Sequence, residues 1–172
     1  MKLSLTDLLL VESHDESRDL AGWYLTKIGY RLTSATTCAA GLTLANSGRF
    51  SLYLLGENCE DGATLDLCRQ IRVFDSETPI VICSAWAYPA DCEAGIRAGA
   101  QAYLTKPCEL DELGQTIESL IAEARISGVG KSVDYQGARI TVSQTRLRVM
   151  RLGHPSRSGL RKTQREYHQH RP

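Results

Sequence analysis

No long hydrophobic run occurs in this sequence of 172 residues. The longest uninterrupted aliphatic stretch covers residues 8–11, whereas a membrane-spanning helix needs about 20 apolar residues. Asp7 and Glu12 flank the stretch, which is too short and too acidic at its borders for a secretory signal. We therefore expect a cytoplasmic protein with no membrane partner.

The cysteines lack C-x-x-C spacing; they are residues 38, 59, 68, 83, 92 and 108. This excludes zinc-ribbon and thioredoxin-type motifs, and apolar neighbours predict mostly buried free thiols in a reducing compartment. The sequence also lacks a G-x-G-x-x-G or Walker pattern, so it indicates no phosphate-cradling loop. We expect no cofactor and no metal site.

Neither sign of charge predominates in the whole chain, because 20 Lys and Arg residues balance 20 Asp and Glu residues. The distribution is uneven. Residues 1–126 carry 10 basic and 18 acidic residues, a net charge of −8, whereas residues 127–172 carry 10 basic and 2 acidic residues, a net charge of +8. The chain therefore combines an acidic body with a basic extension.

Short apolar runs alternate with helical periodicity along the acidic body. Runs of four apolar residues without polar alternation are typical of strands buried on both faces of a parallel sheet. Short connections between strands and helices favour right-handed crossovers. The pattern predicts a doubly wound (βα)5 domain of the α/β class. The predicted strands are residues 8–11, 30–35, 52–55, 80–83 and 102–104, and the predicted helices are residues 20–28, 39–45, 65–71, 89–99 and 110–124.

The basic extension has few apolar residues and is not expected to build a core of its own. We assign residues 1–126 to the domain and residues 127–152 to a linker, for which a small hairpin over 133–142 and 147–152 is one interpretation. Residues 153–172 are expected to form a disordered basic tail. Three roles of the extension stay open: a nucleic-acid-binding arm, a solvated tail, or a segment bound to the acidic body.

Polar residues follow four of the predicted strands, where ligands bind in open α/β sheets. The four segments resemble the receiver domain of two-component response regulators, over residues 5–125 and in the order and spacing of that family. The segments read LLLVESHDESR, SLYLLGENCEDGATLDLCRQIR, TPIVICSA and GAQAYLTKP. The resemblance implies a flavodoxin-like fold with a five-stranded parallel sheet in the order 2-1-3-4-5.

The resemblance also implies a chemistry. In the family, an Asp after the third strand accepts a phosphoryl group, a divalent cation neutralises the phosphoryl oxygens, and a Lys and a Ser or Thr hydroxyl assist. In this chain Gly56 occupies the phosphoacceptor position. Glu12 keeps one carboxylate of the acidic pair, but Ser13 replaces the other. Since one carboxylate is too little for a hard cation, the resemblance points to a pseudo-receiver that is not an enzyme.

Other positions match the family. The residues carried over are Asn58 at the carbonyl-donor position, Ser84 as the hydroxyl, Lys106 as the pocket lysine and Tyr103 as the aromatic that signals output. The family pattern implies a cis peptide bond before Pro107, and we expect the amine of Lys106 to pair with Glu12.

Three weaker expectations complete the site. Strand alternation predicts that Glu57 points away from the pocket. Trp86 and Tyr103 are interpreted as packing residues rather than as platforms for a ligand. His14, Cys59 and Cys108 are expected at the same sheet edge, where a metal or redox site is conceivable but lacks motif spacing.

The function predicted from the resemblance is a phosphorylation-independent protein-interaction module in bacterial two-component signalling. Its contact surface would be the fourth helix, fifth strand and fifth helix, and its partner a histidine kinase, another regulator or a second copy. The alternative is a transcription regulator, because residues 132–154 resemble the start of a winged-helix DNA-binding domain; weak non-specific nucleic-acid binding by the tail is compatible with either. A flavodoxin-like enzyme lacks a catalytic constellation in this sequence.

Overall fold

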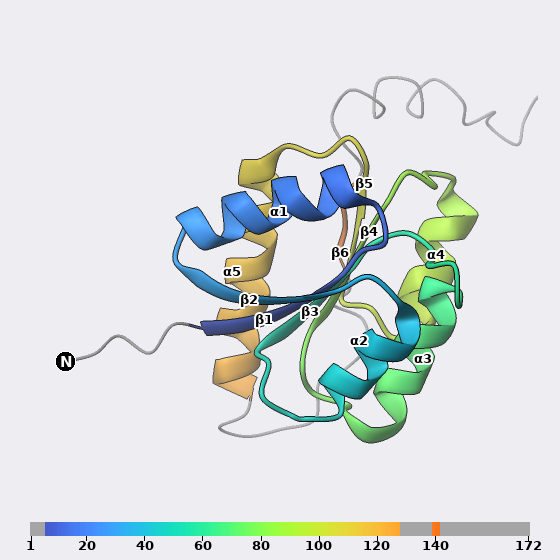
Figure 1. Cartoon of the computed structure of the whole chain (residues 1–172), viewed down its shortest axis with the longest axis horizontal. Coiled ribbons are helices and arrows are strands. Elements are labelled where there is room, and N and C mark those ends of the chain that lie inside the picture. The colour runs from blue at the N-terminus through green and yellow to red at the C-terminus, as the bar shows by residue number, and fades with distance from the viewer. Residues whose placement is uncertain (1–5, 128–138, 142–172) are drawn as a thin grey trace, which may run out of the picture.

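The computed structural model describes residues 6–127 and 139–141, in which strands and helices alternate along the chain (Figure 1). The strands are β1 (Thr6–Val11), β2 (Tyr30–Ala35), β3 (Leu52–Leu55), β4 (Ile80–Ser84), β5 (Ala102–Thr105) and β6 (Arg139–Thr141). The helices are α1 (Asp15–Lys27), α2 (Cys38–Ala45), α3 (Thr64–Phe74), α4 (Pro89–Arg97) and α5 (Leu110–Ser127).

The strands form one parallel sheet in the order β2-β1-β3-β4-β5-β6. The predicted order 2-1-3-4-5 of the flavodoxin-like fold is confirmed for β1 to β5. The sheet has one strand more than expected, because β6 pairs with β5. In this pairing Tyr103 lies opposite Ile140. This strand is three residues long and has one apolar residue in sequence, so it lacks the continuous apolar run on which the prediction relied.

Helices cover both faces of the sheet, with α1 and α5 on one face and α2, α3 and α4 on the other (Figure 1). Side chains of β1 alternate between the two cores. Leu8 and Leu10 pack toward α1 and α5, whereas Leu9 and Val11 pack toward the opposite helices. Burial on both faces explains why the strands are continuously apolar in sequence.

Several helix boundaries follow local sequence signals. Gly29 and Gly99 adopt positive φ angles of 99° and 112° after α1 and α4, as expected of residues that end helices. Pro89 begins α4, where its missing N–H costs no hydrogen bond. Within the part of the chain that the structure describes, no helix is both long enough and apolar enough to cross a membrane.

Most of the basic extension lies outside the described residues. Arg139–Thr141 pairs in parallel with β5, whereas the hairpin interpretation required an antiparallel partner at residues 147–152. That partner segment and the tail at residues 153–172 are not described, so both interpretations stay predictions.

Candidate functional site

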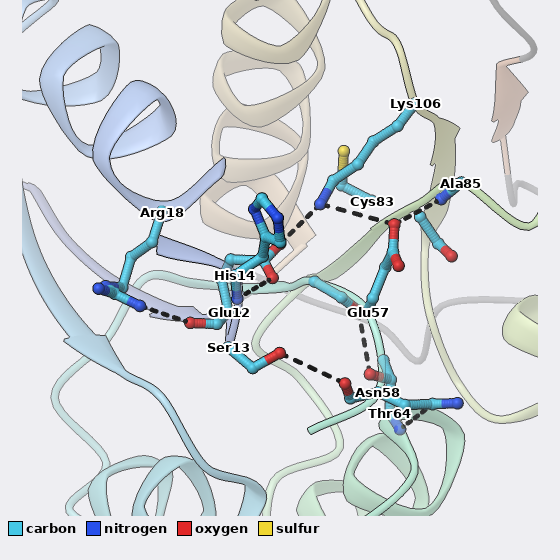
Figure 2. A network of polar contacts seen from close by, with 12 residues as sticks. Glu12, Ser13, His14, Arg18, Glu57, Asn58, Thr64, Cys83, Ala85 and Lys106 are labelled. Carbon is cyan, nitrogen blue, oxygen red and sulfur yellow. Dashed lines mark hydrogen bonds and ion pairs between the residues drawn. The ribbon is translucent and has the colours of Figure 1, made fainter. Parts of the chain in front are cut away.

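Residues from four strand ends converge at the carboxyl edge of the sheet. Glu12 follows β1, Gly56 follows β3, Ser84 ends β4 and Lys106 follows β5. These strands are parallel neighbours, so their ends open onto the same edge. Figure 2 shows Glu12, Glu57 and Lys106 pointing toward one another there.

Glu12 is the most enclosed charged group of this site, with 2% of its surface exposed. Its Oε2 accepts a hydrogen bond from Lys106 Nζ at 2.7 Å, and its Oε1 accepts one from His14 N at 2.9 Å. The expected pairing of Lys106 with Glu12 is therefore confirmed, as is the cis peptide bond between Lys106 and Pro107. Because both carboxylate oxygens are engaged, the side chain is held in one orientation.

The carboxylate of Glu12 lies over Gly56. A Cβ built on Gly56 would lie 2.6 Å from Glu12 Cδ and closer still to Oε2. Such an approach is far shorter than ordinary van der Waals contact, so a side chain at position 56 would displace the carboxylate. Gly56 and Glu12 therefore fit each other, because the first leaves the space that the second fills.

Glu57 points into the pocket, so the prediction that it points away is wrong. Its Oε1 accepts a hydrogen bond from Ala85 N at 3.1 Å and lies 3.9 Å from Lys106 Nζ. The alternation of side chains applies only within an extended strand, and β3 ends at Leu55. Glu57 is thus a second carboxylate facing Lys106.

Ser13 binds the backbone of the β3–α3 loop and Asn58 binds the backbone at the start of α3, so neither forms an acidic pocket. Ser13 Oγ donates to Asn58 O across 3.4 Å, which is long for a hydroxyl hydrogen bond. Asn58 Oδ1 accepts from Thr64 N at 3.0 Å, and Thr64 Oγ1 donates to Gly56 O at 3.0 Å. These contacts hold the loop against the first turn of α3.

Tyr103 lies inside the molecule, with 3% of its surface exposed, and its hydroxyl donates to Trp86 O at 2.8 Å. Its ring packs on α4, where a Cβ built on Gly95 would lie 2.5 Å from Tyr103 Cδ2. Burial raises the pKa of the phenol. Ser84 Oγ accepts from Trp86 N at 3.2 Å, which ties the end of β4 to the loop before α4.

The structure does not bring His14, Cys59 and Cys108 together; each of the two cysteines lies beside another cysteine. Cys108 Sγ is 3.7 Å from Cys83 Sγ. This contact and burial raise the pKa of Cys83, while the same contact lowers the pKa of Cys108. Cys59 lies near Cys38, and burial with this neighbour raises its pKa to about 12. These pairs join residues far apart in sequence, so no local spacing signals them.

Comparisons with known proteins agree on one family. The family model of the response regulator receiver domain matches residues 8–118. The uncharacterized transcriptional regulatory protein YkoG of Bacillus subtilis is 28% identical over 135 residues, which cover 77% of this chain and 59% of YkoG. The response regulator ArlR of Staphylococcus epidermidis is 29% identical over 143 residues, which cover 81% of this chain and 65% of ArlR. The chain thus spans less than two thirds of these relatives.

A kinase and a solved structure extend the comparison. The sensor histidine kinase AruS of Pseudomonas aeruginosa is 30% identical over 138 residues, which cover 78% of this chain and 14% of the kinase. The crystal structure of a CheY-like receiver domain protein from Methanospirillum hungatei superposes with a TM-score of 0.69 at 23% identity, covering 73% of this chain and all of that one. This structural likeness supports the fold.

Proposed function

The chain belongs to the response regulator receiver domain family, whose members act in two-component signalling, and from this premise we propose that it is a pseudo-receiver that signals without being phosphorylated. Phosphoryl transfer requires a nucleophilic oxygen and compensation for the charge on the transferred group. Position 56 offers no side-chain oxygen. We therefore expect the domain to have no phosphotransfer activity.

One observation carries this proposal: the carboxylate of Glu12 lies in the space above Gly56 and pairs with Lys106 at 2.7 Å. The positive charge that would otherwise meet a phosphoryl group is already compensated by a buried partner. An incoming phosphoryl group would have to separate this pair. The carboxylate of Glu12 would then be buried next to the negative charge of the phosphoryl group. Such a separation is costly because a buried ionised group loses its compensation.

The donor set does not fit the divalent cation that the family uses. Such a cation prefers several oxygen ligands of high charge. Here the carboxylates of Glu12 and Glu57 face the ammonium group of Lys106, and Ser13 supplies a hydroxyl where the family has a second carboxylate.

A domain without phosphotransfer chemistry acts through its surface, and we place the contact surface at α4, β5 and α5. Trp86 and Tyr88, just before α4, are 59% and 73% exposed, and aromatic residues are enriched at protein interfaces. The outer edge of β5 is already paired with β6, so a partner would meet helix surfaces and these aromatics instead of adding a strand. A histidine kinase, another regulator and a second copy stay open as partners.

Transcription regulation is the second candidate function. YkoG, which carries the name of a transcriptional regulatory protein, aligns with this chain over 135 residues, more than residues 8–118 that the receiver family model covers. The basic residues after position 126 supply charge that suits a nucleic acid. Sequence-selective DNA binding would favour this candidate over a pure protein-interaction module.

Thermal melting with magnesium and beryllium fluoride, a phosphoryl analogue, tests the pseudo-receiver proposal. We expect no change in the melting temperature of the full chain, because neither group finds its ligands. The variant Ser13→Asp/Gly56→Asp is the matched control and is expected to melt at a higher temperature with both groups than without them. A comparable rise for the unmodified chain would contradict the proposal.

A further inference from the structure

A group of side chains that can bind a metal ion lies beside the pocket and takes no part in the contacts of Glu12 and Lys106. Cys38 Sγ, Cys59 Sγ and a carboxylate oxygen of Asp61 all lie within 4.8 Å of one another. Cys38 is the first residue of α2, whereas Cys59 and Asp61 belong to the loop between β3 and α3. The geometry points to a zinc-binding site formed by these three residues, with water as the fourth ligand.

The distances suit a tetrahedral ion after a small adjustment. A zinc ion with Zn–S bonds of about 2.3 Å and a Zn–O bond of about 2.0–2.2 Å holds its ligand atoms about 3.5–3.8 Å apart. Atoms that already lie within 4.8 Å of one another need to approach by roughly 1 Å. Side-chain rotation of two cysteines and one aspartate covers such a distance without moving the backbone.

The backbone around the loop ligands is already fixed. Cys59 N donates to Gly62 O at 3.0 Å, and Gly62 N donates to Cys59 O at 3.2 Å, which closes a tight turn. Cys38 Sγ donates to the same Gly62 O at 3.4 Å, so the turn lies against the start of α2. The ligands are therefore brought together by the protein before an ion arrives, which lowers the ordering cost of binding.

Asp61 is oriented in the same way. Its two carboxylate oxygens accept hydrogen bonds from Cys38 N at 2.7 Å and Ala39 N at 2.9 Å. An ionised carboxylate has about four acceptor positions, so both oxygens keep a lone pair for a metal. Hydrogen bonds that orient a ligating carboxylate are a regular feature of metal sites.

The chemistry of the ligands selects the ion. Thiolates favour zinc over magnesium or calcium, which prefer sites made of oxygen ligands alone. Cys38 and Cys59 are 9% and 8% exposed and Asp61 lies at the surface, so a hydrated ion can reach the site and keep one water. Binding releases the two thiol protons to solvent, with no change in oxidation state. The ion would tie the loop after Gly56 to α2.

Cobalt titration of the full chain in a phosphine reductant tests the site. We expect thiolate-to-cobalt charge-transfer absorption together with the visible bands of tetrahedral cobalt, and zinc should displace both. The absorption should be lost in Cys38→Ser and in Cys59→Ser, and Asp61→Asn should weaken cobalt binding at least about tenfold. The histidines at positions 154, 168 and 170 give no thiolate signal.

The matched control is Cys108→Ser, because Cys83 and Cys108 form the other close thiol pair, with sulfurs 3.7 Å apart. We expect this variant to keep the full cobalt signal. A second measurement needs no variant: zinc should slow alkylation of Cys38 and Cys59 in the unmodified chain and leave the alkylation rate of Cys108 unchanged. Absence of the thiolate signal, its survival in both Cys38→Ser and Cys59→Ser, or zinc protection of Cys108 alone would overturn the inference.

Discussion

At the scale of single residues, Glu12 determines what the pocket can do. It occupies the space above Gly56, and its two oxygens bind Lys106 and the backbone N–H of His14. Burial of a carboxylate is costly unless it is paired or hydrogen-bonded, and Glu12 has both kinds of partner. The positive charge of Lys106 is thus compensated by carboxylates of the pocket itself.

The first prediction concerns the pair of Glu12 and Lys106. Glu12→Gln keeps the shape of the side chain but removes its charge, so Lys106 retains only the more distant carboxylate of Glu57 at 3.9 Å. We expect the free energy of unfolding to fall by about 1–3 kcal/mol. Urea denaturation measures this loss. Glu60→Gln, at an exposed position of the same region, should change it by less than about 0.5 kcal/mol.

A double-mutant cycle separates the pair from its surroundings. Lys106→Met alone leaves Glu12 buried without its main partner and is expected to be more destabilising than Glu12→Gln. The double variant should be more stable than the sum of the single effects predicts, by at least about 1 kcal/mol. Additive effects would show that the two side chains do not stabilise each other.

Gly56, Glu12 and Lys106 are predictable from the resemblance to receiver domains, and Glu12 and Gly56 also directly follow clear apolar runs. Sequence reasoning misplaced Glu57, since the alternation rule was applied beyond the end of β3. It also missed the pairing of Cys38 with Cys59 and of Cys83 with Cys108. These contacts depend on how a helix, a strand and two loops meet in the fold, which no local pattern encodes.

At the scale of elements, α4 approaches β5 closely at one glycine. Gly95 leaves the space for the ring of Tyr103, since a Cβ there would lie 2.5 Å from Cδ2 of the ring. The hydroxyl of Tyr103 meanwhile binds the backbone of Trp86. The buried position of Tyr103 therefore depends on a helix residue without a side chain.

The second prediction follows from this contact. Gly95→Ala should destabilise the domain despite the better helix propensity of alanine, because the new methyl group collides with a buried ring. In the background Tyr103→Ala the same substitution should be neutral or stabilising by up to about 1 kcal/mol. Thermal melting compares the two backgrounds.

Gly22→Ala in α1 is the matched control, since its Cβ would meet Leu32 at an ordinary 3.4 Å. It should be neutral or slightly stabilising. If Gly95→Ala changes the melting temperature equally with and without the Tyr103 ring, the proposed contact is contradicted.

The third prediction concerns pH and the loop between α3 and β4. Asp75 Oδ2 accepts from Tyr53 OH at 2.7 Å, and its Oδ1 accepts from Thr78 N at 2.9 Å and Glu77 N at 3.1 Å. Burial raises the pKa of Asp75, but these hydrogen bonds outweigh burial and hold the pKa below its ordinary value of 3.8. The stabilisation is thus present above pH 3.8 and is lost as the pH falls through the lower pKa of the folded state.

Asp75→Ala should therefore lower the free energy of unfolding by about 1–2 kcal/mol at neutral pH. The difference in the free energy of unfolding between Asp75→Ala and the unmodified chain should become smaller below pH 3.8, the ordinary pKa of an aspartate. Melting curves across the acid range measure this, with the exposed Glu77→Ala as a control. A difference that stays constant into the acid range would contradict a role for the ionised carboxylate.

The elements themselves were largely predictable. The strand over residues 52–55 has the expected bounds, because its continuous apolar run stops at Gly56. The strand over residues 30–35 also has the expected bounds, although Arg31 and Ser34 interrupt its apolar residues and make its sequence signal weaker. Gly29 and Pro89 marked helix ends for reasons of backbone geometry. β6 lies within the hairpin strand offered over residues 133–142, but its parallel pairing with β5 was not predictable, since the partner of a short edge strand is not encoded in its own composition.

At the scale of the whole molecule, the separation of charge along the chain bears on nucleic acids. Residues 127–172 carry a net charge of +8 and residues 1–126 a net charge of −8. The fourth prediction is that the full chain binds duplex DNA only weakly, with a Kd of roughly 10⁻⁴–10⁻⁶ M at physiological salt. Fluorescence anisotropy should show binding that fades as salt rises. A sub-micromolar, sequence-selective complex would favour transcription regulation instead.

The last prediction concerns phosphorylation of the whole chain. Intact mass after incubation with magnesium and a small phosphodonor measures directly whether the chain accepts a phosphoryl group. Gly56→Asp alone should restore little, because the new side chain meets the carboxylate of Glu12 and Ser13 leaves a cation short of a ligand. Ser13→Asp/Gly56→Asp should gain one phosphoryl group in part of the molecules.

The same measurement on the unmodified chain tests most directly whether the domain signals without being phosphorylated. We expect its mass not to change, since no side-chain oxygen stands at position 56 and Glu12 keeps Lys106 paired. A gain of one phosphoryl group, mapped to the carboxyl edge of the sheet, would contradict the account.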